Sequence, residues 1–229
     1  MFEHGDVVTI ALESTTQTFS VQKALLCNAS RYFTTALSGA FKESDAQTLK
    51  LPGCDEHTFR LFLYWLCNHK FPDPYKDAVT LTHGSEEKKA YITTQQLLLV
   101  KLWVFGDAYL LPRLQNDTMR RLLQLLQDTY IRAEAVQLAF TAAPFASKIR
   151  EVAIAELVHS YGKHDQYGGL RYDDDDISLL AATPGLMQSM LQTLTTLDCC
   201  RVCANDGCAK KPAAAVGRVE ERQYMVSEQ

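Results

Sequence analysis

Four cysteines towards the C-terminal end of the sequence have the spacing that most resembles a chemical site. Cys200 and Cys203 are separated by two residues, as paired ligands of structural zinc sites are. Cys208 could supply a third thiolate, and Cys199 or His159 a fourth ligand. No second pair with this spacing is present, and two adjacent cysteines fit one tetrahedral centre poorly. A redox pair would open a helix after a strand, whereas this one follows a predicted helix. We predict no metal and no cofactor, but zinc binding by these cysteines stays open.

Catalytic arrangements are not assembled elsewhere in the sequence. It contains no Gly-x-Ser-x-Gly motif, no Gly-x-x-x-x-Gly-Lys-[Ser/Thr] loop and no His-Glu-x-x-His motif. The six histidines are dispersed along the chain. We therefore predict that the protein is not an enzyme.

Length, composition and charge narrow the class of protein further. The 229 residues carry a formal net charge of −4 and no long basic run, which argues against a nucleic-acid partner. No stretch of about 18 apolar residues is present, so no membrane span is expected. The N-terminus does not resemble a secretory signal, which predicts a cytoplasmic or nuclear protein with reduced thiols. Cys27, Cys54 and Cys67 are expected to be small buried hydrophobic residues.

The N-terminal part of the chain alternates between strand and helix patterns. Residues 6–13 and 18–22 are predicted strands, because β-branched residues or alternating apolar residues dominate them. Short helices are expected over 23–27 and 30–37, the second capped by Ser30. Residues 48–51 return as a strand before Pro52-Gly53.

Helices dominate the rest of the sequence. Residues 55–69 form the clearest amphipathic helix, with Asp55 as its cap and an aromatic face that belongs to a core. A helix capped by Thr94 runs to about residue 111 and is apolar on almost every side, so it must be buried nearly all round. Pro112 is expected to open the next helix. Further helices are predicted over 133–142 and 147–161, from about 177, and over 184–197.

The order of several short motifs resembles the BTB (POZ) domain family. The motifs are Val21-Gln22-Lys23, Ser30-Arg31-Tyr32-Phe33, Gly39-Ala40-Phe41-Lys42-Glu43-Ser44 and Leu49-Lys50-Leu51-Pro52. Gln22 departs from the family, which usually has His there. The stretch Leu102–Tyr109 resembles members from filamentous fungi in particular. The resemblance implies an α+β BTB/POZ fold, in which a small β-sheet is flanked by helices, followed by an α-helical C-terminal region.

Three regions follow from this resemblance and from composition. Residues 5–126 are expected to form the BTB/POZ domain, with a surface-loop insertion at about 70–91, where Pro72, Pro74 and Gly84 break regular structure. Residues 128–198 form a helical extension. Residues 199–229 form a cysteine-containing tail that we predict to be disordered.

The resemblance also implies the function. BTB domains mediate protein–protein interaction, and many serve as substrate adaptors for cullin-3 ubiquitin ligases through a motif of an apolar residue, any residue and Glu. Phe41, Lys42 and Glu43 match that motif, although Phe41 could instead fold back onto the core. The family's charged pocket corresponds to Asp6 and Lys23, for which a partly exposed ion pair is the alternative.

Partners beyond a cullin-3-type scaffold are less defined by the sequence. A homodimer is possible in this family, but many BTB dimers exchange elements that precede the first core strand, and only about five residues precede it here. The alternative function is an oligomerising scaffold, linked to transcription, that binds no cullin. Client recognition would come from the helical extension or from the loop over 70–91.

Overall fold

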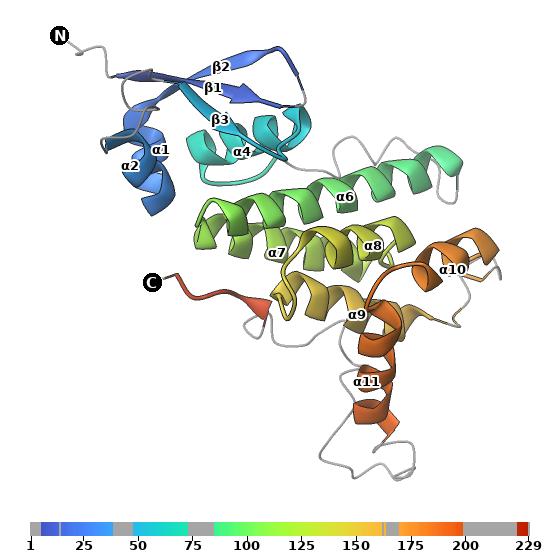
Figure 1. Cartoon of the computed structure of the whole chain (residues 1–229). Helices are drawn as coiled ribbons and strands as arrows, with labels where there is room; N and C mark the ends of the chain where they lie inside the picture. Colours follow the sequence, from blue (N-terminus) through green and yellow to red (C-terminus); the bar gives the residue numbers. More distant parts are fainter. Residues whose placement is uncertain are drawn as a thin grey trace.

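The computed structural model describes residues 6–13, 15–38, 48–72, 85–161, 163, 170–198 and 224–228. A small sheet with short helices forms the N-terminal part of the molecule, and the remainder is helical (Figure 1). Two long helices, α6 (Glu86–Ala108) and α7 (Pro112–Gln127), lie side by side between that part and the C-terminal helices. The predicted α+β class, a small sheet flanked by helices, is confirmed.

The sheet has the strand order β2-β1-β3. Its central strand β1 (Val7–Leu12) pairs antiparallel with β2 (Thr18–Gln22) and parallel with β3 (Thr48–Leu51). Val8 and every second residue after it on β1 are buried, as a strand covered on one face requires. Ile10 lies opposite Leu49 of β3. All three strands lie where the sequence predicted them.

Two short helices flank the sheet, and a side-chain cap fixes the start of the second. Helix α1 (Lys23–Ala29) leads directly into α2 (Arg31–Ser38). Between them, Ser30 accepts a hydrogen bond from the backbone N–H of Tyr32 at 3.0 Å, which confirms the predicted cap. Its hydroxyl also donates to the carbonyl oxygen of Tyr109 at 2.5 Å. This second bond ties the start of α2 to the end of α6.

Helix α4 (Glu56–Asn68) closes the first of two hydrophobic cores, which we call the first core. Asp55 caps α4 by accepting from the N–H of Thr58 at 2.9 Å, as predicted. Aromatic rings dominate this core: the centroids of Phe62 and Phe105 are 4.9 Å apart. Its buried members are Val8, Ile10, Leu12, Val21, Leu26, Phe33, Leu37, Leu49, Leu51, Cys54, Phe59, Phe62, Trp65, Leu66, Leu102, Phe105, Tyr109, Leu111 and Leu114.

Helix α6 begins earlier than the sequence predicted. The expected loop over 70–91 is wrong from Glu86 onwards, because these residues are helical, and the expected cap at Thr94 is wrong for the same reason. Residues 73–84 of that loop lie outside the described part of the chain. The actual cap is Ser85, whose hydroxyl accepts from the N–H of Lys88 at 3.2 Å. Two acidic residues in the first turn are favoured by the helix dipole. These first turns carry mostly polar residues, so a search for an apolar stripe passes over them.

Helix α6 is apolar nearly all round because it separates the two cores. Leu102 and Phe105 face the first core, whereas Leu99, Val100 and Trp103 face the second. The prediction that this helix is buried on almost every side is confirmed for its C-terminal half. Since α6 supplies residues to both cores, neither core can form completely without it.

Four C-terminal helices build the second core together with α6 and α7; one of them, α8, packs against α6, and the other three pack against α8 or against one another. They are α8 (Ala133–Ala142), α9 (Lys148–Ser160), α10 (Asp174–Ala181) and α11 (Leu186–Asp198). Small and aliphatic side chains form most of this core. Its buried members are Leu99, Val100, Trp103, Met119, Leu122, Leu125, Leu126, Ile131, Ala133, Ala135, Val136, Ala139, Phe140, Ala143, Ile149, Val152, Ala153, Ile154, Leu157, Tyr172, Leu180, Leu186 and Tyr224.

The predicted disordered tail over 199–229 is wrong for residues 224–228. Tyr224 is buried in the second core, and the backbone of Val226 bonds to Asn116 of α7. Figure 1 shows this segment beside the N-terminal end of α7. The prediction rested on the composition of residues 210–229, with their stretch over 212–217, and overlooked one apolar triplet, Tyr-Met-Val. Residues 199–223 lie outside the described part.

Candidate interaction surfaces

The predicted partner motif is bracketed by two buried anchors. Its three members lie outside the described residues; they are Phe41, Lys42 and Glu43. On one side, Leu37 in the last turn of α2 is buried in the first core. On the other side, Leu49 of β3 is buried in the same core. The connection that carries the motif is thus attached at both ends to one packed unit.

The helix that precedes this motif is held firmly in place. The ring of Phe33 stacks on that of Tyr109, with centroids 5.9 Å apart, and Tyr32 meets Tyr109 edge-on at 5.1 Å. Tyr109 also receives the hydrogen bond from Ser30. Three contacts to one residue at the end of α6 therefore fix the orientation of α2.

Asp6 and Lys23, predicted to share a charged pocket, are neighbours through their backbones. The N–H of Lys23 donates to the carbonyl oxygen of Asp6 at 2.8 Å. Asp6 is exposed and Lys23 is half-buried. In the part of the chain that the structure describes, no ion pair joins their side chains. The two residues are brought together, and a role for their charges stays a prediction.

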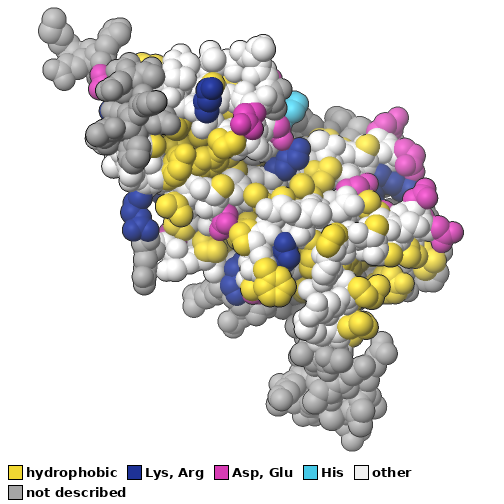
Figure 2. All heavy atoms as spheres, viewed as in Figure 1, with side chains coloured by type: hydrophobic (Ala, Val, Ile, Leu, Met, Phe, Trp, Pro, Cys, Tyr) yellow, Lys and Arg dark blue, Asp and Glu magenta, His cyan; other side chains and the backbone are white. Residues whose placement is uncertain are grey.

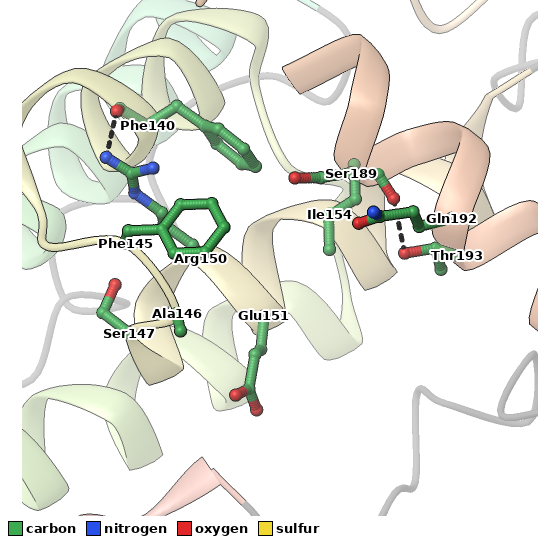
Figure 3. A pocket seen from close by; sticks show the side chains of 10 residues that line it. All are labelled: Phe140, Phe145, Ala146, Ser147, Arg150, Glu151, Ile154, Ser189, Gln192 and Thr193. Atoms are coloured by element: carbon green, nitrogen blue, oxygen red, sulfur yellow. Dashed lines mark hydrogen bonds between the residues drawn. The ribbon is translucent and has the colours of Figure 1, made fainter. Parts of the chain in front are cut away.

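A cleft of about 290 Å³ opens between the end of α8, the start of α9 and α11 (Figure 3). Phe145 stands at its mouth with 84% of its surface exposed, in a turn where Ala146 has a φ of 60°. On α11, Met187 and Leu191 are also largely exposed. The cleft is lined by Phe140, Phe145, Ala146, Ser147, Arg150, Glu151, Ile154, Ser189, Gln192 and Thr193.

The two charged side chains of this cleft form contacts within the fold. Arg150 donates through Nη2 to the carbonyl oxygens of Phe140 at 2.5 Å and Ala143 at 2.6 Å. Its positive charge thereby lies at the C-terminal end of α8, where the helix dipole favours a cation. Glu151 pairs with Lys148 at 2.9 Å. No histidine or cysteine is among the residues that line the cleft, and Phe140, Phe145 and Ile154 supply its apolar lining.

The cysteines differ from one another in their surroundings. Cys54 is buried, and burial together with the nearby charge of Asp55 raises its pKa to about 12, so its thiol stays protonated. Cys27 is half-buried. Cys67 is exposed, so the prediction that all three are buried is wrong for this residue, which follows buried Leu66 and faces away from the core.

The tail cysteines Cys199, Cys200, Cys203 and Cys208 lie outside the described residues. Among those described, no group of three or more His, Cys, Asp or Glu side chains is arranged to hold a metal ion. Likewise, none of the helices in the described ranges is long and apolar enough to cross a membrane.

Acidic side chains gather at the end of the molecule where α6 begins and α10 lies (Figure 2). They include the exposed residues Glu86 and Glu87 in the first turn of α6, and Asp174 and Asp175 in the first turn of α10. Asp173 caps α10 in a reciprocal capping box. Acidic residues at helix N-termini are favoured by the dipole, which accounts for this cluster structurally.

Two surfaces escaped the sequence reasoning altogether. The first is the cleft behind Phe145, for which the exposed aromatic after Pro144 was the available signal. The second is the surface of α7 and the second core against which residues 224–228 pack; we call this site the groove beside α7. The apolar triplet Tyr224-Met225-Val226 near the end of the sequence was the signal for this site.

Comparison with known proteins gives one family. A family model described as BTB/POZ domain matches residues 1–94. The matched stretch includes the three strands, α1, α2 and α4, and it ends within α6. No curated protein matches the chain. The first core extends beyond the match, because Leu102 and Leu114 belong to it.

Proposed function

The N-terminal part of this chain is a BTB/POZ domain, a module through which proteins bind one another, and on that premise we propose that the protein is a substrate adaptor of a cullin-3-type ubiquitin ligase. The observation that supports the adaptor role is the motif Phe41-Lys42-Glu43 directly after α2, where adaptors of this family carry theirs. We place the protein in the cytoplasm or the nucleus.

The packing of α2 favours this role on physical grounds. A docking motif binds more tightly when the residues beside it are already fixed, since ordering a segment on binding costs free energy. Leu37 and Tyr109 anchor the segment that leads into the motif. An apolar residue such as Phe41 can then fill a pocket on the scaffold, while Glu43 pairs with a cation at the rim of the interface.

An oligomerising scaffold that does not bind cullin is the second candidate. The feature that favours it is the extent of helical surface outside the matched residues, including the cleft beside Phe145. Such a protein would self-associate as its concentration rises. In the adaptor proposal, the same helical region is the place for client recognition.

Calorimetric titration of the purified chain with the N-terminal helical domain of cullin-3 tests the adaptor role. We expect micromolar binding, which corresponds to roughly −8 kcal/mol, and at least about a ten-fold loss in Phe41→Ala and in Glu43→Lys. Two matched controls are Phe145→Ala and Glu13→Lys, which change an exposed phenylalanine and an exposed glutamate elsewhere. These controls should bind as the unaltered chain does.

The opposite outcome is equally informative. If the folded chain shows no heat of binding, the adaptor proposal fails. Sedimentation of the same samples over a range of concentrations then tests the scaffold, which predicts a rising mass. Equal losses in the controls and in the motif variants would show that the binding surface lies elsewhere.

A further inference from the structure

Residues 224–228 occupy a groove beside α7 in the manner of a bound peptide. Tyr224 inserts into the second core with only 6% of its surface exposed. Met225 and Val226 pack against the same core and are half-buried. Ser227, by contrast, is exposed. One aromatic anchor and two flanking apolar contacts thus hold this short segment.

The side chain of Asn116 on α7 forms hydrogen bonds with the backbone of this segment. Its Oδ1 accepts from the N–H of Val226 at 2.7 Å, and its Nδ2 donates to the carbonyl oxygen of Val226 at 3.1 Å. Nδ2 also donates to Oε1 of Glu228 at 2.7 Å. The side chain of Asn116 is 3% exposed, and within the described ranges all its hydrogen bonds go to these two residues. One buried amide thereby satisfies both main-chain groups of a single residue.

This combination is typical of sites that bind extended peptides. In such sites, main-chain hydrogen bonds give affinity and pockets for selected side chains give specificity. Here the selected side chain is Tyr224, which is buried in the second core. The hydrogen bond to Asn116 requires a free N–H at position 226, and the amide of Asn116 favours a carboxylate at position 228. A buried amide without an occupant would lose its hydrogen bonds, so the groove favours being filled.

The segment lies far from α11 along the sequence. Helix α11 ends at Asp198, and about 25 residues that can span up to roughly 80 Å separate it from Tyr224. The groove itself is made by residues far away in sequence. Nothing in the covalent connection therefore requires that the occupant come from the same chain.

We propose that the groove beside α7 is a binding site for linear peptide segments of the pattern Tyr-apolar-Val-x-Glu, and that residues 224–228 fill it as a displaceable ligand in cis. The partner is a protein that carries such a segment in an unstructured region. The proposal does not depend on cullin binding, because no residue of the Phe41-Lys42-Glu43 motif takes part.

The test uses the full chain with its resident segment released. Tyr224→Ala together with Val226→Pro removes the anchor and the N–H that Asn116 bonds, which gives a tail-open variant. A fluorescent peptide covering residues 222–229 should bind this variant saturably in an anisotropy titration. It should bind the unaltered chain at least about ten-fold more weakly, because the resident segment competes at an effective concentration on the order of millimolar.

Altered peptides keep the test independent of protein folding. A peptide N-methylated at Val226, or one with Tyr224→Ala, should bind the tail-open variant at least about ten-fold more weakly than the natural sequence. In the protein, Asn116→Ala added to the tail-open variant should remove binding. Asn68→Ala, which alters an exposed asparagine of α4, should not change it.

Three results would overturn the proposal. They are no saturable binding to a tail-open variant that circular dichroism shows to be folded, equal binding of the N-methylated and natural peptides, and equal binding to the Asn116→Ala protein when it is folded. If the unaltered chain dimerises while the tail-open variant does not, the site stands and its partner is a second copy of the chain.

Discussion

The two hydrophobic cores of this molecule are built by different means. The first core joins a sheet to helices through large aromatic rings, and Phe33, Phe62 and Phe105 lie at its centre. The second core packs helices closely through alanines and leucines. It also lies against ionisable groups, since Glu156 is buried and His159 is half-buried on α9. The first core therefore depends on the packing of large rings. The second core also lies beside groups whose charge changes with pH.

The two cores share helices α6 and α7. Helix α6 contributes residues to both, and α7 contributes Leu114 to the first and Met119 to the second. Each core also contains one of the two tryptophans, Trp65 in the first and Trp103 in the second. Damage to either core should consequently reach the other through the shared helices, and the tryptophans can report it.

Truncation of a central ring of the first core should have the largest effect. Phe62 is fully buried, and Phe62→Ala should lower the free energy of unfolding by about 3–5 kcal/mol through lost burial and a residual cavity. Because α6 and α7 belong to both cores, both should unfold together. Urea unfolding followed by fluorescence in Trp65→Phe and Trp103→Phe backgrounds measures the two cores separately, and their midpoints should fall by the same amount.

Tyr64→Ala on the same helix is the control for this experiment. Tyr64 is 40% exposed, so the change in the free energy of unfolding should stay within about 0.5 kcal/mol. If Phe62→Ala moves the midpoint reported by Trp65 but leaves that reported by Trp103 in place, the cores unfold independently. The interpretation that α6 and α7 couple the two cores would then be wrong.

The buried carboxyl of the second core should make stability depend on pH. Burial raises the pKa of Glu156 to about 7, against the opposing charges of Lys163 and Arg171. The folded state thus keeps a proton that the unfolded state releases near pH 4.5. Stability from this group is complete below that pH and is lost as pH rises through about 7, by about 3 kcal/mol in total. Thermal melting between pH 4.5 and 8 measures the loss.

Glu156→Gln should remove this loss, because the amide cannot ionise. The pH dependence of stability that remains in this variant should have the opposite sign. It comes from His159, whose pKa is lowered by burial and by the charges of Lys163 and Arg171. A histidine of that kind adds stability as pH rises through its ordinary value. Glu151→Gln changes an exposed carboxyl on the same helix and is the control. Identical pH profiles for Glu156→Gln and the unaltered chain would contradict the assignment.

Local signals explain why much of the fold was predictable from the sequence. Ser30, Asp55 and Pro112 each act within a few residues of their own position, and each begins a helix where the sequence predicted one. The aromatic motifs of the first core are equally legible, because their spacing follows the period of one helix or strand. This is why the BTB fold could be identified from a single sequence.

The features that were missed depend on contacts between distant residues. Nothing near Tyr224 indicates that Asn116, more than one hundred residues earlier, will clamp the backbone beside it. The cleft beside Phe145 arises only when α11 packs across α9. The start of α6 is a different case, since Ser85 is a local signal that the polar character of the following turns concealed. Most of the features that were not predicted from the sequence therefore depend on tertiary contacts.

The smallest effect should come from the helix caps, where the two regions can be compared directly. Asp55 caps α4 beside the first core and also accepts from Nζ of Lys101 at 2.8 Å, whereas Asp173 caps α10 beside the second core. Each change to alanine should cost about 1 kcal/mol in urea unfolding at pH 7, because either cap satisfies an otherwise unpaired N–H.

Asp55→Asn separates the cap of α4 from the ion pair that shares its carboxylate. Asparagine caps as well as aspartate, and the exposed pair with Lys101 contributes only about 0–1 kcal/mol, so this variant should lose less stability than Asp55→Ala. Although burial raises the pKa of Asp55, the hydrogen bonds from Lys101 and Thr58 outweigh it and lower the pKa overall. Stability from this carboxylate is present above its ordinary pKa and fades as pH falls through the lowered value. Equal losses in the two variants would assign the stabilisation to the ion pair, and the caps of the two regions would then differ in kind.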